Sequence, residues 1–200
     1  MANTDTPSGL RPLRHRNGAP YNGACNPYYV ASGYATALFI GDPVALTGTA
    51  NTAAVEDYPI AALPEVDRLD ATAEYAIGVI VGVGPNRDNL SLTYSPASTA
   101  NIVWVADDPD LIFEVQEDDT DGDALAAVDV SLNADMVYTH AGSTVTGISG
   151  AELDRSTKAA TATLPLRLLR FANRPDNELG ASAYWEVMFN LHAQRYTTGL

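Results

Sequence analysis

The densest group of potential metal ligands in this chain is the acidic run from Glu117 to Asp123, which contains five carboxylates and one glycine. A calcium-binding EF-hand loop places oxygen ligands at alternating positions, glycine at the sixth and a bidentate glutamate at the twelfth. Counted from Glu117, the first, third and fifth residues are acidic and Gly122 is the sixth, but the twelfth is Val128. Because the closing carboxylate is missing, we expect a solvated acidic loop and assign no metal ligands. An irregular calcium or magnesium site is the alternative.

Histidine, serine and glycine patterns that would indicate catalysis are missing from the sequence. His15, His140 and His192 have no zinc-like spacing to one another or to Cys25. The sequence has neither a Gly-x-Ser-x-Gly elbow nor a phosphate-binding Gly-x-x-x-x-Gly-Lys loop. We therefore expect no enzymatic activity and no bound cofactor, and we expect His192 to make a structural hydrogen bond. A hydrolase stays open as an alternative because the members of a serine triad are distant in sequence.

Charge distribution argues against a general nucleic-acid binder. The chain has 11 Lys and Arg residues against 25 Asp and Glu residues, a net charge of −14, whereas nucleic-acid binders present a basic surface. Arg11, Arg14 and Arg16 lie near the N-terminus, and residues 101–150 hold eleven acids and no Lys or Arg. This asymmetry favours contacts between copies of the chain or with another acidic protein.

The single cysteine and the hydropathy pattern bear on location. One cysteine cannot form an internal disulfide, so an intracellular assembly site is natural. The first five residues lack the features of a secretion signal, and no apolar run approaches the length of a membrane span. We therefore expect neither secretion nor a membrane partner.

The N-terminal region, residues 1–30, is expected to form an extended arm. Pro7, Pro12 and Pro20 restrict the backbone to extended geometry. Such an arm has no core of its own, so it is either a disordered terminus or ordered on a neighbouring subunit. The aromatic residues Tyr21, Tyr28 and Tyr29 favour the second interpretation.

Residues 31–200 are expected to form a mainly β body, a barrel or a sandwich, with one or two short helices. Glycine within the apolar segment 76–83 indicates a bulge, a barrel corner or a close backbone approach. Trp104 and Trp185 lie in apolar strand patterns, which favours packing over sugar stacking. Strands are expected at 34–40, 43–47, 76–83, 89–94, 101–105, 111–116, 164–169 and 183–191, and helical turns at 123–129 and 150–159.

Four pieces of sequence, in this order along the chain, form a further pattern. They are 7–12 with His15 and 17–23; 39–44 with 48–50; 94–100 continuing into 107–118; and 174–177 with Asn190, His192 and 198–200. In these pieces the chain resembles the cement, or head-decoration, proteins of tailed bacteriophages with HK97-type capsids.

This resemblance implies a structural virion protein with a β-rich body and no catalytic residues. Such proteins sit outside the capsid, commonly as homotrimers at threefold and quasi-threefold positions, and hold neighbouring capsomers together. The implied partners are the major capsid protein and other copies of the chain, not nucleic acid. The implied location is the virion exterior, after assembly in the host cytoplasm.

Contacts with the capsid or with an adjacent copy are expected between residues 10 and 29. Arginines there would pair with carboxylates, and tyrosines would supply anchor area. The expected contact residues are Leu10, Arg11, Arg14, Arg16, Tyr21, Tyr28 and Tyr29. The alternative function is a carbohydrate- or receptor-binding β-module on the virion surface, which requires Trp104 and Trp185 to be exposed in one groove.

Overall fold

The computed structural model of the protein describes residues 3–55, 62–70, 73–120 and 122–195. Asp121 of the acidic run and residues 198–200 of the fourth sequence piece lie outside them. The strands are β1 (Arg11–His15), β2 (Asn26–Val30), β3 (Pro43–Ala50), β4 (Pro64–Arg68), β5 (Ala76–Val83), β6 (Asn101–Ala106), β7 (Leu111–Gln116), β8 (Asn133–Val137), β9 (Glu152–Ala159), β10 (Leu166–Phe171) and β11 (Tyr184–Phe189), and the 3-10 helices are η1 (Ala127–Asp129) and η2 (Ala193–Arg195).

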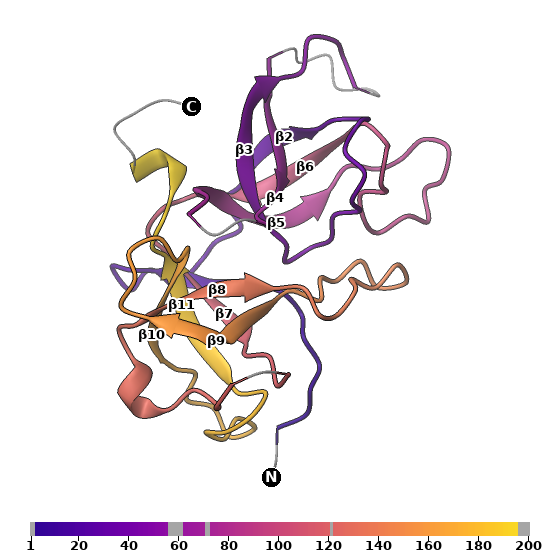
Figure 1. Ribbon diagram of the computed structural model, residues 1–200. Coiled ribbons are helices and arrows are strands. Elements are labelled where there is room, and N and C mark those ends of the chain that lie inside the picture. Colours follow the sequence, from indigo (N-terminus) through magenta and orange to yellow (C-terminus); the bar gives the residue numbers. More distant parts are fainter. Residues whose placement is uncertain (1–2, 56–61, 71–72, 121, 196–200) are drawn as a thin grey trace.

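The strands form two units that lie one above the other in Figure 1. One unit is a closed barrel with strand order β2-β4-β3-β5-β6, and the other is a six-stranded sheet with order β1-β7-β11-β10-β8-β9. Neighbouring strands are antiparallel except β2 and β4, which are parallel. The expected mainly β fold is confirmed. In the described part of the chain, no helix has the length and apolar character that a membrane crossing requires.

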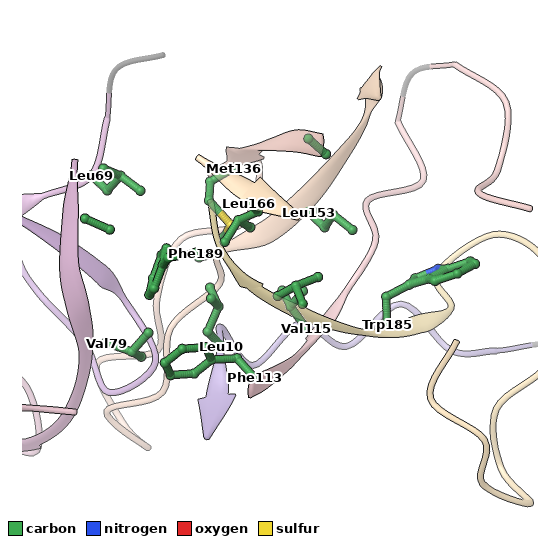
Figure 2. Packing of buried hydrophobic residues seen from close by; sticks show 14 of the residues in the cluster. Leu10, Leu69, Val79, Phe113, Val115, Met136, Leu153, Leu166, Trp185 and Phe189 are labelled. Atoms are coloured by element: carbon green, nitrogen blue, oxygen red, sulfur yellow. The ribbon is translucent and has the colours of Figure 1, made fainter. Parts of the chain in front are cut away.

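One apolar cluster joins the two units. Figure 2 shows Leu69 and Val79 from the barrel side near Leu10, Phe113 and Phe189 from the sheet side. Each of these side chains is 2% exposed or less. Burying a large apolar side chain contributes about 1.5–3 kcal/mol, so this cluster holds the barrel and the sheet together.

The barrel depends on glycine at close backbone contacts, as expected for segment 76–83. A Cβ atom at Gly78 would lie 2.3 Å from the carbonyl oxygen of Ala106 on the neighbouring strand β6. The pairing of β5 with β6 also shifts register between Ile80 and Gly82. Both features follow from strands that bend to close a barrel.

The first 30 residues contribute a strand to each unit. β1 pairs with β7 at the edge of the sheet, and β2 lies between β4 and β6 in the barrel. Gly9 has φ +66°, and a Cβ there would lie 2.5 Å from the carbonyl oxygen of Gly41. The Leu10 amide donates to that same oxygen over 2.9 Å. The N-terminal segment therefore pairs and packs with the sheet and the barrel of its own chain.

Two segments that were expected to be strands, 34–40 and 89–94, are irregular. Within segment 34–40, Leu38 and Ile40 form isolated bridges to Ser95 and Ile148 and no continuous strand. In segment 89–94, residues 90 and 91 form a turn and none of the six belongs to a strand. The side-chain oxygen of Asn86 accepts backbone hydrogen bonds from residues 88 and 89, and such local bonds compete with strand pairing.

The expected helical turn at 150–159 was also wrong, because this segment is β9. β9 pairs with β8 along one edge, and the amide of Asp118 donates to the carbonyl of Leu153 over 3.0 Å. These long-range hydrogen bonds override the local preference. The alanine-rich segment 123–129 contains only the short helix η1 within its described residues.

Candidate docking face

Two glutamates lie side by side at the centre of the outer face of the six-stranded sheet. Glu114 on β7 and Glu186 on β11 are register partners, and each is 7% exposed. Alternation along β7 turns Phe113 and Val115 into the core and leaves Glu114 outside. Like charges directly opposite each other on neighbouring strands are destabilising, so this pair requires compensation.

Four arginines supply that compensation, two for each glutamate. Arg11 and Arg174 bind Oε1 of Glu114 at 2.7 and 2.5 Å. Arg14 and Arg170 both bind Oε2 of Glu186, Arg170 at 2.8 Å. The four ion pairs join β1, β7, β10 and β11, so they tie the N-terminal strand to the sheet.

The charged state of Glu186 is stabilised by these contacts. Burial alone would raise the pKa of this carboxyl, but the hydrogen bonds from Arg14 and Arg170 outweigh burial and lower it. Arg174 also lies over the ring of Tyr184, with its guanidinium carbon 4.2 Å from the ring centroid. The arginines are thereby held in place before any partner binds.

Three more arginines extend this surface. Arg16, Arg167 and Arg195 line a small pocket together with Met188, Phe189 and Asn190. We name the whole set the arginine face; it consists of Arg11, Arg14, Arg16, Arg167, Arg170, Arg174 and Arg195. It holds seven of the 11 basic residues of the chain.

The arginines of this face outnumber the carboxylates that pair with them. Within the described residues, the carboxylates paired with its arginines are Glu114, Glu186, Asp110 and Asp176. Seven arginines against four carboxylates leave 7 − 4 = +3. The whole chain carries −14, so the remainder carries −14 − 3 = −17.

The structure brings some of the expected contact residues together and separates others. Arg11, Arg14 and Arg16 belong to the arginine face, with Arg16 exposed. Leu10 and Tyr28 are 0% and 6% exposed, so a partner would reach them only after the chain rearranged.

The three tyrosines take up positions within their own chain. The Tyr28 hydroxyl donates to Asp107 over 2.8 Å inside the barrel wall, and burial raises the pKa of Tyr28. Tyr29 is half-buried on the same strand. Tyr21 is half-buried and its hydroxyl donates to the carbonyl of Ala24 over 3.0 Å. Contact of these tyrosines with a partner stays a prediction.

The sequence interpretation missed the partners of the N-terminal arginines. Arg167 and Arg170 lie on β10 and are exposed, and Glu114 and Glu186 occupy outward positions of β7 and β11. A signal was present, because charged residues within otherwise apolar strands mark an outward face. Their mutual proximity depends on the strand order, which local pattern does not reveal.

Among the residues that the structure describes, one group of three side chains could supply metal ligands. Asp5, His140 and Glu152 each offer an atom, and these atoms lie within 4.8 Å of one another. However, His140 Nδ1 lies 2.8 Å from Glu152 and Nε2 lies 3.3 Å from Asp5. The hydrogen bond to Glu152 is the main cause of a raised pKa at His140. A protonated imidazole satisfies both carboxylates, so one ion pair would have to open before a metal could bind.

The acidic run does not form a comparable group among its described residues. Glu117 and Asp118 are 0% and 3% exposed, which contradicts a wholly solvated loop. Glu117 accepts a hydrogen bond from the amide of Leu125, and Asp118 accepts one from the amide of Arg155. Both carboxylates therefore organise the local backbone.

The remaining candidates also have structural positions. His192 is 2% exposed and its Nδ1 accepts a hydrogen bond from the amide of Gln194. Trp185 is fully buried, and Trp104 is half-buried on β6 of the barrel. The two tryptophans therefore do not form a shared exposed groove.

Comparison with known proteins identified no relative of this chain. No family model matches this chain, and no curated protein or solved structure is significantly similar to it. The geometry and charge of the arginine face are therefore the structural observations that bear on function.

Proposed function

We propose that this protein is a structural virion component that binds the outside of an HK97-type phage capsid and strengthens contacts between capsomers. In this proposal it acts as a trimer at threefold and quasi-threefold positions, and the major capsid protein is its partner. The sequence resemblance supports this role. The structural observation that carries the proposal is the arginine face, a surface with an excess of +3 on a protein of net charge −14.

Charge complementarity explains how such a face would orient the protein. Acidic surfaces repel one another, and a positive patch steers an acidic partner to one side of the molecule. The rest of this chain is strongly acidic, so an acidic capsid surface would dock on the arginine face and be repelled elsewhere.

Preorganisation adds to this argument. Glu114 and Glu186 hold four arginines in place by ion pairs, so less side-chain freedom is lost when a partner binds. Three copies that grip several capsomers would also gain from multivalency, which turns modest contacts into firm attachment.

Co-sedimentation with expanded, undecorated shells of the capsid protein from the same genome tests the proposal. The expected result is saturable binding at a fixed stoichiometry. Arg170→Ala should weaken it, because this side chain is 60% exposed on the arginine face. Arg87→Ala is the matched control, since it removes an exposed arginine on a loop after β5. Failure to bind under any salt condition contradicts the proposal.

A further inference from the structure

The pocket within the arginine face is lined by more arginines than there are carboxylates paired with them. Arg16, Arg167 and Arg195 surround a cavity of about 120 Å³, with Met188 and Phe189 among its lining residues. Arg195 pairs with Asp110. Among the described residues, the Arg167 guanidinium donates to the amide oxygens of two asparagines, at 3.2 and 2.7 Å, and to no carboxylate.

Arg16 is the least satisfied member of the group. Its backbone amide donates to the carbonyl of Asp110 over 2.7 Å, and its guanidinium has no hydrogen bond or ion pair with another described residue. Three guanidinium groups therefore face one carboxylate. An anion placed between them would gain charge-assisted hydrogen bonds, which are about twice as strong as neutral ones.

Size and lining restrict the kind of anion. A cavity of about 120 Å³ is smaller than the roughly 300–1,000 Å³ typical of small-molecule pockets. It suits one carboxylate or phosphate group. Met188 is 7% exposed and lines the pocket, where it offers a small apolar contact to the methylene groups that carry a side-chain carboxylate, whereas the Phe189 side chain belongs to the core cluster.

We propose that this pocket receives a carboxylate side chain, Asp or Glu, from the protein that docks on the arginine face. The inference rests on the proposed function for the source of the carboxylate. The guanidinium groups of Arg16 and Arg167 bind its two oxygens, and Arg195 adds positive charge at the rim. The pocket thereby selects one acidic side chain of the partner and fixes the register of docking.

A titration of the free protein with glutarate tests the pocket without any capsid. The Nε–Hε NMR signals of Arg16 and Arg167 should shift saturably with glutarate, and Arg16→Ala should abolish saturation. Arg16→Ala should leave the fold intact because the guanidinium pairs with none of the residues that the structure describes. Arg87→Ala, the control, should bind glutarate like the parent protein. Lack of saturable shifts overturns the inference.

Two further experiments distinguish a side-chain carboxylate of the partner from a free anion as the occupant of the pocket. If inorganic phosphate saturates these signals and glutarate does not, the pocket is a free-anion site and the carboxylate assignment is wrong.

In shell binding, Arg16→Ala should lower affinity roughly tenfold, which corresponds to the loss of one charged hydrogen bond. Unchanged shell binding by Arg16→Ala overturns the inference and leaves the proposed function standing. If the parent protein does not bind shells, the proposed function fails, and the partner assignment of the pocket fails with it even if glutarate binds.

Discussion

At the scale of single residues, the stability of the outer sheet face depends on how its two buried glutamates are neutralised. Arg14 contacts Glu186 with a side chain that is 28% exposed. Arg16 lies two residues further along the chain and is exposed. Substituting each arginine in turn therefore distinguishes the effect on stability of losing an ion pair from the effect of losing an exposed charge.

Arg14→Ala should destabilise the protein by about 1–3 kcal/mol at neutral pH, because it leaves Glu186 buried with one partner. Arg16→Ala should change stability by less than about 0.5 kcal/mol. Urea unfolding measures both free energies of unfolding.

The arginines lower the pKa of Glu186, so their stabilisation of the fold exists above the ordinary glutamate pKa and is lost as the pH falls. The destabilisation by Arg14→Ala should therefore shrink in acid; an undiminished loss would contradict the ion-pair explanation.

Glu117 behaves in the opposite way. Burial raises its pKa from 4.5 to about 7, although hydrogen bonds from Leu125 and others partly offset this. A carboxyl with a raised pKa holds its proton longer in the folded state, so stability falls as the pH rises from about 4.5 to about 7.

Glu117→Gln removes this titration. The variant should lose less stability than the parent between pH 5 and pH 8, with a difference on the order of 2–3 kcal/mol. Guanidinium unfolding at the two pH values measures it, and Glu114→Gln, at an outward position with two arginine partners, serves as comparison. Parallel curves for Glu117→Gln and the parent would show that Glu117 is not the titrating group.

At the scale of elements, the stretch before β1 meets the stretch before β3 in a close backbone contact between Gly9 and Gly41. Gly9→Ala should lower the melting temperature strongly, because the new Cβ would lie 2.5 Å from the Gly41 carbonyl oxygen and the residue has φ +66°. Gly18→Ala is the matched control, with φ +91° and nothing within 4 Å of the new Cβ. Its cost should be limited to the backbone conformation, about 1 kcal/mol. Equal losses would remove the close contact as the cause.

Deletion of residues 1–30 should do more than remove a docking arm. It takes β2 out of a five-stranded closed barrel and removes Tyr28 and Val30 from the barrel core. We expect loss of cooperative unfolding and rapid proteolysis of the barrel. Thermal unfolding monitored by circular dichroism measures the first, and limited trypsin digestion measures the second. Deletion of residues 1–5 is the control, since it leaves both N-terminal strands in place. A stable product of the longer deletion would contradict this expectation.

At the scale of the whole molecule, docking through an arginine face makes attachment sensitive to salt. Raising the salt from about 50 mM to about 500 mM shortens the Debye length several-fold, so shell binding should weaken steeply. Arg170→Ala should flatten this dependence, whereas Arg87→Ala should not. Binding that is insensitive to salt would point to apolar contacts as the main attachment.

Much of the fold was predictable from the sequence because it depends on local pattern. Segments 76–83, 101–105 and 111–116 are short and rich in β-branched and aromatic residues, and all three are strands. A turn at residues 109 and 110 precedes the last of them. β9 was missed because its stability comes from its pairing with β8 and from the Asp118 amide, which lie far away in sequence.

Composition and local periodicity, by themselves, determined that this chain is acidic, mainly β and supplied with arginines near its N-terminus. The tertiary structure decided where those arginines lie. Strand order places β1 beside β7 and β10 beside β11, so Arg11 and Arg14 meet Glu114 and Glu186 across more than 100 positions of sequence. Side-chain pattern specifies which face of a strand is polar, whereas the neighbour of that strand is set by burial and hydrogen bonding of the whole chain.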